Sequence, residues 1–180
     1  MLIAIVVAVV VVIAIAAILL YNNLVKLRNR VDNAWSQIDV QLQRRHDLIP
    51  NLVETVKGYA AHENATLESV IAARSQAMSA QTPEEKMAAE NFLTGTLKSL
   101  FAVSEAYPDL KANQNFLQLQ NQLEQTEDKI SYMRQSYNDV VMKYNTAIQT
   151  IPGVLFSGVF KPRDSFDAVE GAEVAPQVRF

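Results

Sequence analysis

The chain has 180 residues, a formal net charge of −3 and no cysteine. The length allows one domain with a hydrophobic core, and the lack of cysteine excludes disulfides, thiolate metal sites and a cysteine nucleophile. No basic block stands out, which argues against nucleic-acid binding. With only five glycines, and six prolines lying mostly between periodic segments, the composition favours a few long helices over many short strands.

The N-terminal segment from Leu2 to Leu20 is entirely apolar. As a helix, this segment would extend about 28 Å, which matches the hydrocarbon core of a bilayer. The alternative is a cleaved signal peptide ending near Ala16, but no basic residue precedes the run and the apolar residues continue beyond Ala16. We therefore predict a retained transmembrane helix over residues 1–21.

Three basic residues follow the apolar segment closely, namely Lys26, Arg28 and Arg30. The positive-inside rule then places the N-terminus outside and the C-terminal domain in the cytoplasm. The same side chains are predicted to contact anionic lipid headgroups, at about 1 kcal/mol each near the surface. Topology alone would also explain their position, and the two roles are compatible.

Apolar residues at spacings of three and four continue from Leu24 to Ile49, which predicts that the membrane helix extends into water as one helix. Gln41 and Arg45 lie on this apolar stripe. A buried Arg45 would require a carboxylate from a neighbouring helix; alternatively, its charged end reaches the bundle edge while its stem stays packed. Pro50 is expected to break or kink the helix.

Two further helices are predicted before residue 110. The first extends from Asn51 to about Ala80, although Gly58 and residues 61–64 weaken it. The second begins with Thr82 as the N-cap, Pro83 at the first helical position and Glu85 completing a capping box. It ends at residues 107–109.

A last helix is predicted over residues 113–150. Apolar or aromatic residues recur every seven positions, and a second heptad series between them contains one polar residue, Thr126. The first series comprises Phe116, Leu123, Ile130, Tyr137, Tyr144 and Ile151, and the second Leu119, Thr126, Met133, Val140 and Ala147. Pro152 and Gly153 end this helix.

Short connections between long helices predict antiparallel neighbours. The predicted fold is therefore all-α, with an N-terminal transmembrane helix continuous with a long antiparallel up-and-down four-helix bundle over residues 22–160. Residues 154–160 should lie near the bilayer, packed on the bundle base or, less favoured, in the lipid interface. Residues 161–180 are predicted to form an extended, mobile tail, with Val178 and Phe180 as candidate docking residues.

Residues 34–63, AWSQIDVQLQRRHDLIPNLVETVKGYAAHE, resemble the signature of the LemA family. Ala72–Arg74, the Gln-rich last helix and the ending APQVRF are similar to the same family, so the resemblance covers nearly the whole chain. It implies a single-pass protein of the bacterial inner (plasma) membrane with an up-and-down helical bundle and no established enzymatic activity. One branch of the family is associated with magnetosome membranes, which hints at membrane organisation.

The densest polar cluster extends from Arg44 to Glu63. His46 and His62, with Glu54 or Glu63, could form a metal site or an acid–base pair. The two histidines are separated by a proline and do not form a HExxH motif, so we favour a helix end with solvated charges and expect no catalytic, cofactor or metal site.

We accordingly predict a membrane-anchored scaffold or interaction protein and not an enzyme. Its expected partners are the lipid bilayer and either further copies of itself or other membrane proteins, with no nucleic acid. One alternative is a membrane-shaping or membrane-organising oligomer that uses the basic flank and residues 154–160. Another is a membrane-tethered enzyme that uses the Arg44–His62 cluster.

Overall fold

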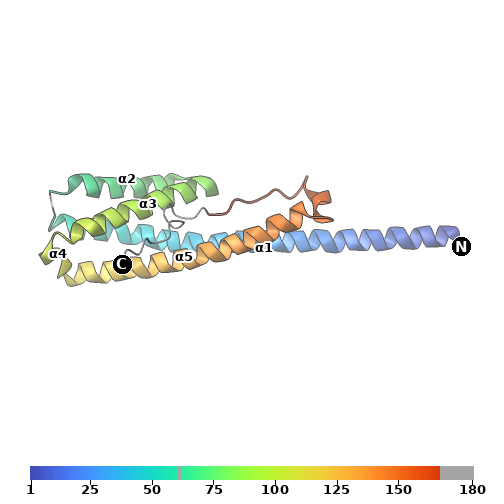
Figure 1. Cartoon of the computed structure of the whole chain (residues 1–180), viewed down its shortest axis with the longest axis horizontal. Helices are drawn as coiled ribbons and strands as arrows, with labels where there is room; N and C mark the ends of the chain where they lie inside the picture. Colours follow the sequence, from blue (N-terminus) through green and yellow to red (C-terminus); the bar gives the residue numbers. More distant parts are fainter. Residues whose placement is uncertain (61, 167–180) are drawn as a thin grey trace, which may run out of the picture. The chain divides into compact units, whose positions relative to one another are not determined.

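The computed structural model describes residues 1–60 and 62–166, and its regular secondary structure within these residues is helical throughout (Figure 1). The all-helical prediction is confirmed. The helices are α1 (Leu2–Lys57), α2 (Asn64–Ser79), α3 (Pro83–Ser104), α4 (Pro108–Lys111) and α5 (Gln114–Gln149), followed by the 3₁₀ helix η1 (Gly153–Phe156). The predicted docking residues Val178 and Phe180 lie outside the described residues.

The chain divides into two compact units. The first unit comprises Met1–Gln37 and Met133–Ser165, and the described part of the second comprises Ile38–Tyr132 and Phe166. Helices α1 and α5 each contribute to both units.

Helix α1 continues through Pro50 to Lys57, so of the predicted break or kink at Pro50, the break is wrong. Pro50 is exposed, whereas the residues beside it on the inner face, Ile49, Leu52 and Val53, are buried. A proline ring on the solvent side removes one backbone hydrogen bond, but the apolar face on the other side keeps its packing. Tertiary burial therefore outweighs the local helix-breaking tendency here.

The predicted single helix from Asn51 to Ala80 is also wrong, because α1 ends at Lys57 and α2 begins at Asn64. Gly58 follows the last helical residue, and the amides of Tyr59 and Ala60 both donate to the carbonyl of Val56 in a turn. Gly58 therefore ends the helix despite the continuing apolar periodicity. Ala60 is fully buried and fastens this turn to the core.

Local signals at the start of α3 are confirmed in detail. Thr82 is the N-cap, Pro83 occupies the first turn, and Glu85 completes a reciprocal capping box. The Glu85 backbone amide donates to Thr82 Oγ1 at 3.1 Å, while the Glu85 carboxylate accepts from the amides of Gln81 and Thr82. These hydrogen bonds lower the pKa of Glu85 below its ordinary value.

Helix α5 agrees with its predicted bounds to within one residue at each end. The first heptad series is buried from Phe116 to Tyr144, but Ile151 is exposed. Toward the C-terminal end, the buried positions become Val141 and Ile148 in place of Val140 and Ala147. A straight α-helix of 3.6 residues per turn drifts relative to a seven-residue repeat, which accounts for the shift.

The second unit has a core to which α1, α2, α3, α4 and α5 all contribute side chains. Its fully enclosed members include Leu52 and Val56 of α1, Val70 of α2, Leu93 and Leu100 of α3, Leu110 of α4, and Phe116 and Leu123 of α5. Helices α2 and α3 pack against each other after a connection of three residues. Burial of these large apolar side chains is the main source of stability for the unit.

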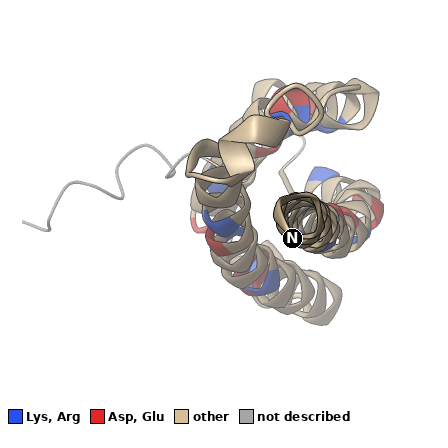
Figure 2. Cartoon of the chain, turned by 90° about the vertical axis from the view of Figure 1, so that its right-hand side faces the viewer, with Lys and Arg blue, Asp and Glu red and all other residues tan. Residues whose placement is uncertain are grey.

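The first unit contains the apolar start of α1, the end of α5 and the segment that follows it. None of the most apolar window of α1 is buried in the protein, and the helix is long and apolar enough to cross a membrane. Figure 2 looks along the chain from the N-terminal end of α1, where no Lys, Arg, Asp or Glu occurs before Lys26. Further along, Trp35 of α1 packs edge-on against Tyr137 of α5 at 5.6 Å between ring centroids.

Residues 161–165 have no regular secondary structure and are hydrogen-bonded to α5. Tyr144 Oη donates to the carbonyl of Lys161 at 2.9 Å, and Tyr137 Oη donates to that of Asp164 at 3.1 Å. Asn145 exchanges two hydrogen bonds with the backbone of Arg163. The part of the predicted tail that the structure describes is therefore fastened along α5.

Candidate functional site

A cluster of buried ionic side chains lies in the second unit, centred on Arg45 of α1. The Arg45 side chain is fully buried. Of the two alternatives that the sequence left open, the structure therefore shows a buried guanidinium and not one that reaches the bundle edge. Arg45 Nη2 donates to the Glu90 carboxylate of α3, and Arg45 Nη1 donates to Glu127 Oε1 of α5 at 2.6 Å. Two carboxylates from two other helices thus compensate the burial of the charge.

Thr94, His46 and Arg74 complete the cluster around the Arg45 guanidinium. Arg45 Nη1 also donates to Thr94 Oγ1 at 2.9 Å, and Thr94 Oγ1 in turn donates to the carbonyl of Glu90. His46 is buried beside Arg45, with its Nε2 atom 2.8 Å from Glu90 Oε1. The backbone carbonyl of His46 accepts from Arg74 Nε of α2 at 2.8 Å, so all four long helices contribute to the cluster.

The electrostatics of the cluster favour an ionised Glu90. Burial alone would raise the pKa of the Glu90 carboxyl group, but the hydrogen bond from His46 and the positive charges of Arg45 and His46 outweigh it. The net effect is a pKa below the ordinary value of 4.5. The site is therefore a closed arrangement in which the Arg45 guanidinium is held by the side chains of Glu90 and Glu127.

A carboxylate partner for Arg45 was one of the two alternatives that the sequence left open, and the sequence did not identify Glu90, Thr94 or Glu127. A signal for Glu90 was present, because it lies on the buried stripe of α3 that also contains Met87, Leu93 and Leu97. A charged residue on an apolar stripe indicates a buried pair when a second such residue exists elsewhere in the chain. Glu127 directly follows the heptad residue Thr126 and carried no comparable signal.

The other two residues predicted for a buried polar layer lie in different surroundings. Thr126 is buried, and its hydroxyl donates to the carbonyl of Gln122 within α5 at 2.7 Å. Gln41 is half-buried, and its Oε1 atom has no hydrogen-bond partner among the described residues. Neither side chain belongs to the Arg45 cluster.

The two histidines considered for a metal or acid–base site have different environments. His46 is enclosed next to Glu90, whereas His62 is exposed in the turn between α1 and α2. Glu63 accepts from Tyr107 Oη at 3.0 Å, and this contact raises the pKa of Tyr107. Within residues 1–60 and 62–166, His, Asp and Glu side chains form no group of three that could hold a metal ion.

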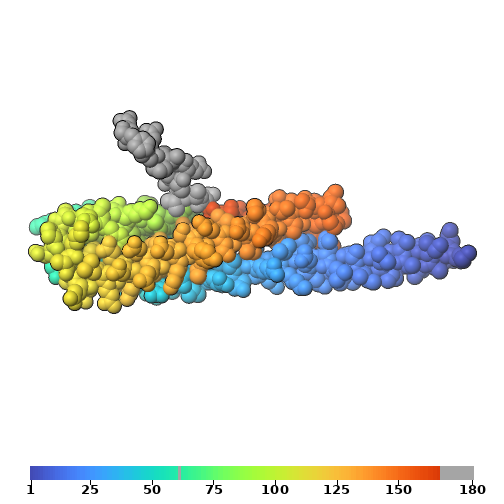
Figure 3. All heavy atoms as spheres, turned by 60° about the horizontal axis from the view of Figure 1, so that its bottom comes forward, coloured from blue at the N-terminus to red at the C-terminus, as the bar shows by residue number. Residues whose placement is uncertain are grey.

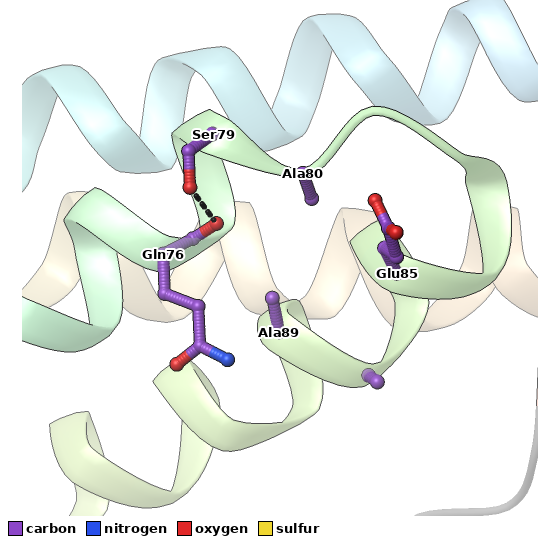
Figure 4. Close-up of a pocket in the computed structure, with 6 residues that line it drawn as sticks. Gln76, Ser79, Ala80, Glu85 and Ala89 are labelled. Atoms are coloured by element: carbon purple, nitrogen blue, oxygen red, sulfur yellow. Dashed lines mark hydrogen bonds between the residues drawn. The ribbon is translucent and has the colours of Figure 1, made fainter.

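Two shallow hollows lie on the second unit. One of about 410 Å³ is bordered by α3 and α5 and reaches the Arg45 cluster through Thr94 and Glu127. The other, of about 330 Å³, lies between the end of α2 and the start of α3 and is lined by Gln76, Ser79, Ala80, Glu85, Ala88 and Ala89 (Figure 4). The Glu85 carboxylate in this second hollow is already hydrogen-bonded in the capping box, so it is not available to bind a ligand.

The residues predicted to contact the membrane surface lie in the first unit. Lys26 and Arg30 are exposed, and Arg28 is half-buried with its guanidinium carbon 5.7 Å from the centre of the Phe160 ring. This distance is within the range of a cation–π contact. Their interaction with lipid headgroups stays a prediction.

The fold and the site define an all-helical protein whose first helix begins with an apolar segment of membrane-spanning length and whose core encloses an ionic cluster. Residues 34–180 match the LemA family. The chain belongs to the LemA family, as the sequence resemblance predicted. It is 29% identical over 133 residues to Protein LemA of Metamycoplasma hominis, an alignment that covers 72% of this chain and 59% of that protein. The chain thus matches less than two thirds of the length of this relative.

Proposed function

We propose that the protein is a single-pass membrane protein of the bacterial plasma membrane that holds a helical bundle at the membrane surface as a scaffold for other proteins. The observation that carries this proposal is the continuity of α1. Its first part is apolar and is not buried against the described part of the protein, while its later part supplies Ile49, Leu52 and Val56 to the core. One continuous helix can therefore be both the anchor and the first element of the bundle.

The bundle of this proposal has four antiparallel helical segments. These are the later part of α1, then α2, α3 and the first part of α5. The connections between them are short, and α4 forms part of the last one. Short connections favour antiparallel neighbours, and residues of all four segments share one core and one ionic cluster.

A binding role agrees better with the cluster chemistry than catalysis does. His46 and Glu90 would form a plausible acid–base pair, but both are buried, and Glu90 is already bound to Arg45. A general base must reach a proton on its substrate. The exposed surface of the second unit instead offers large apolar side chains suited to protein contacts, including Val40, Ile71, Phe92 and Tyr132.

The proposed orientation has the N-terminus outside and the second unit in the cytoplasm. The support is the position of Lys26, Arg28 and Arg30 directly after the apolar segment. Fusion of a fluorescent protein or of alkaline phosphatase to the C-terminus tests it in living cells. We expect the fluorescent-protein fusion to fluoresce and the phosphatase fusion to be inactive. An active phosphatase fusion together with a non-fluorescent fluorescent-protein fusion would show the opposite orientation.

The scaffold role is tested by photo-crosslinking in the membrane. The crosslinking amino acid p-benzoylphenylalanine replaces Phe92 or Tyr132, which are exposed aromatic residues of similar shape. We expect discrete adducts with a second copy of the chain or with other membrane proteins, and the same substitution at the exposed Ser75 provides the control. Absence of adducts at every apolar position would contradict the scaffold role.

A membrane-organising role is the second candidate. The observation that favours it is a group of exposed aliphatic residues after α5, namely Ile151, Val154, Leu155 and Val159. Membrane-organising oligomers combine such apolar contacts with a basic flank. Vesicles that keep their shape when the full-length protein is reconstituted at high density would count against this role.

A further inference from the structure

The segment after α5 has two faces of opposite character. Phe160 is buried and Phe156 is half-buried, whereas Ile151, Leu155 and Val159 are 87%, 80% and 60% exposed. In a water-soluble surface loop, large aliphatic side chains at such exposure are unfavourable when they gather within nine residues. The exposed face therefore requires a partner.

The inner face fixes this segment to a defined level of α1. Tyr21 contacts the rings of Phe156 and Phe160 edge-on, with centroids 5.9 and 5.4 Å away, and Arg28 lies over Phe160. Figures 1 and 3 show the end of α5 and the following residues, in orange and red, against this part of α1. Tyr21 is the first residue after the apolar run, so the exposed side chains lie beside the end of the membrane-spanning segment.

The charge of the first unit suits an anionic surface. It contains seven Lys or Arg residues against three Asp residues, whereas the whole chain has a net charge of −3. Basic residues next to a membrane are attracted by anionic lipids at about 1 kcal/mol each. Aliphatic side chains within a basic surface are typical of segments that lie in the lipid interface.

We propose that residues 151–159 form a second membrane contact, with Ile151, Leu155 and Val159 inserted into the lipid interface beside the point where α1 leaves the bilayer. This inference rests on the proposed membrane anchoring by α1. An apolar run of nineteen residues ends at Leu20, so Tyr21 would lie at the boundary between hydrocarbon and headgroups, where tyrosine is enriched. The contacts with Tyr21 bring Leu155 and Val159 to the same depth.

Lipid explains this placement better than a second copy of the chain. Within the unit, α1 contacts α5 through Trp35 and Tyr137 at one level, and it contacts η1 through Tyr21 and Phe156 at another. The two levels are fourteen residues apart on α1, or about 21 Å along a helix. The exposed aliphatic group occurs at the membrane-proximal level, where lipid is available without any assembly step.

The test uses the absence of native cysteine, so each introduced cysteine is labelled uniquely with a nitroxide. Full-length Leu155→Cys and Val159→Cys variants are reconstituted into vesicles of phosphatidylethanolamine and phosphatidylglycerol. Power-saturation electron paramagnetic resonance compares accessibility to oxygen, which concentrates in lipid, with accessibility to a water-soluble nickel chelate. Val10→Cys reports the anchor, and Met142→Cys, an exposed apolar site on α5, is the matched control.

We expect labels at Leu155 and Val159 to be more accessible to oxygen than to nickel, as at Val10, and the label at Met142 to show the reverse. Nickel accessibility at Leu155 and Val159 with a lipid-buried Val10 label would overturn the second contact but leave the anchor intact. Low accessibility to both reagents would indicate a protein interface and would also overturn it. A nickel-accessible Val10 label would refute the anchor itself.

Discussion

Replacement of Glu90 by Gln tests whether the buried ionic cluster holds the second unit together. The substitution keeps the shape of the side chain but removes the charge that faces Arg45 and His46. The Glu90 and Arg45 side chains are 2% and 0% exposed, so solvent cannot take over the lost interaction. Loss of one partner in a buried pair costs about 3–5 kcal/mol, because the other charge stays buried.

The expected loss lies at the lower end of that range. Arg45 keeps its contacts with Glu127 Oε1 at 2.6 Å and Thr94 Oγ1 at 2.9 Å, so its charge stays partly compensated. We therefore expect Glu90→Gln to lower the free energy of unfolding by about 3 kcal/mol. With a urea dependence of about 2 kcal/mol per molar, the unfolding midpoint would fall by about 1.5 M.

The assay is urea unfolding of the full-length protein in mild detergent, followed by far-ultraviolet circular dichroism. The matched control is Asp39→Asn, which removes the exposed pair between Asp39 and Lys86, whose side chains are 50% and 30% exposed. That variant should lose less than about 1 kcal/mol. Equal midpoints for the two variants would refute the reasoning that burial makes the Glu90 interaction strong.

Three further predictions use the same assay. The pKa of Glu90 is lowered in the folded protein, so its contribution to stability is present above the ordinary value of 4.5 and is lost as the pH falls from there through the folded pKa. The difference in the free energy of unfolding between wild type and Glu90→Gln should therefore become smaller in acid. A difference that does not change with pH would contradict this link between the pKa of Glu90 and stability. Gly153→Ala should destabilise the protein by about 1–3 kcal/mol, because its Cβ atom would lie 1.8 Å from the Ala147 carbonyl oxygen. Gly158→Ala, with no heavy atom within 4 Å, is its control, and equal effects would contradict the close approach. Thr82→Ala should lose about 1 kcal/mol by removing the N-cap of α3, and an unchanged midpoint would show that the cap is dispensable.

The features that sequence predicted well are those set by neighbouring residues. The capping box at Thr82 and Glu85 needs only four consecutive residues to form, and the bounds of α5 follow from a periodic run ended by Pro152. Pro50 misled the prediction because local rules do not include the burial of Ile49 and Leu52 on the opposite face. At Gly58 the error had the opposite sign. The prediction followed the continuing apolar stripe and extended the helix past Gly58, although the glycine does end it.

The ionic cluster illustrates what the sequence could not provide. Arg45 on an apolar stripe implied a carboxylate partner, but its two partners lie 45 and 82 residues away in the chain. Many acidic residues would satisfy the same requirement, and only the packing of the helices selects among them. Glu90 could have been identified as a partner of Arg45, because it is an acidic residue on the apolar stripe of α3. No feature of the sequence distinguished half-buried Glu127 from other acidic residues.

The distribution of charge connects the ionic cluster to the proposed membrane role. Seven basic and three acidic residues lie in the first unit, which leaves nine basic and sixteen acidic residues for the remainder of the chain. An anionic lipid surface attracts the first set and repels the second, over a distance of about one Debye length, or 8 Å at physiological salt. Arg45 and Glu90 are both buried, so their pair removes one basic and one acidic residue from the surface and leaves the acidic excess of this remainder unchanged. This remainder therefore has no electrostatic attraction to an anionic lipid surface, and under the proposed anchoring its exposed apolar side chains stay available to protein partners.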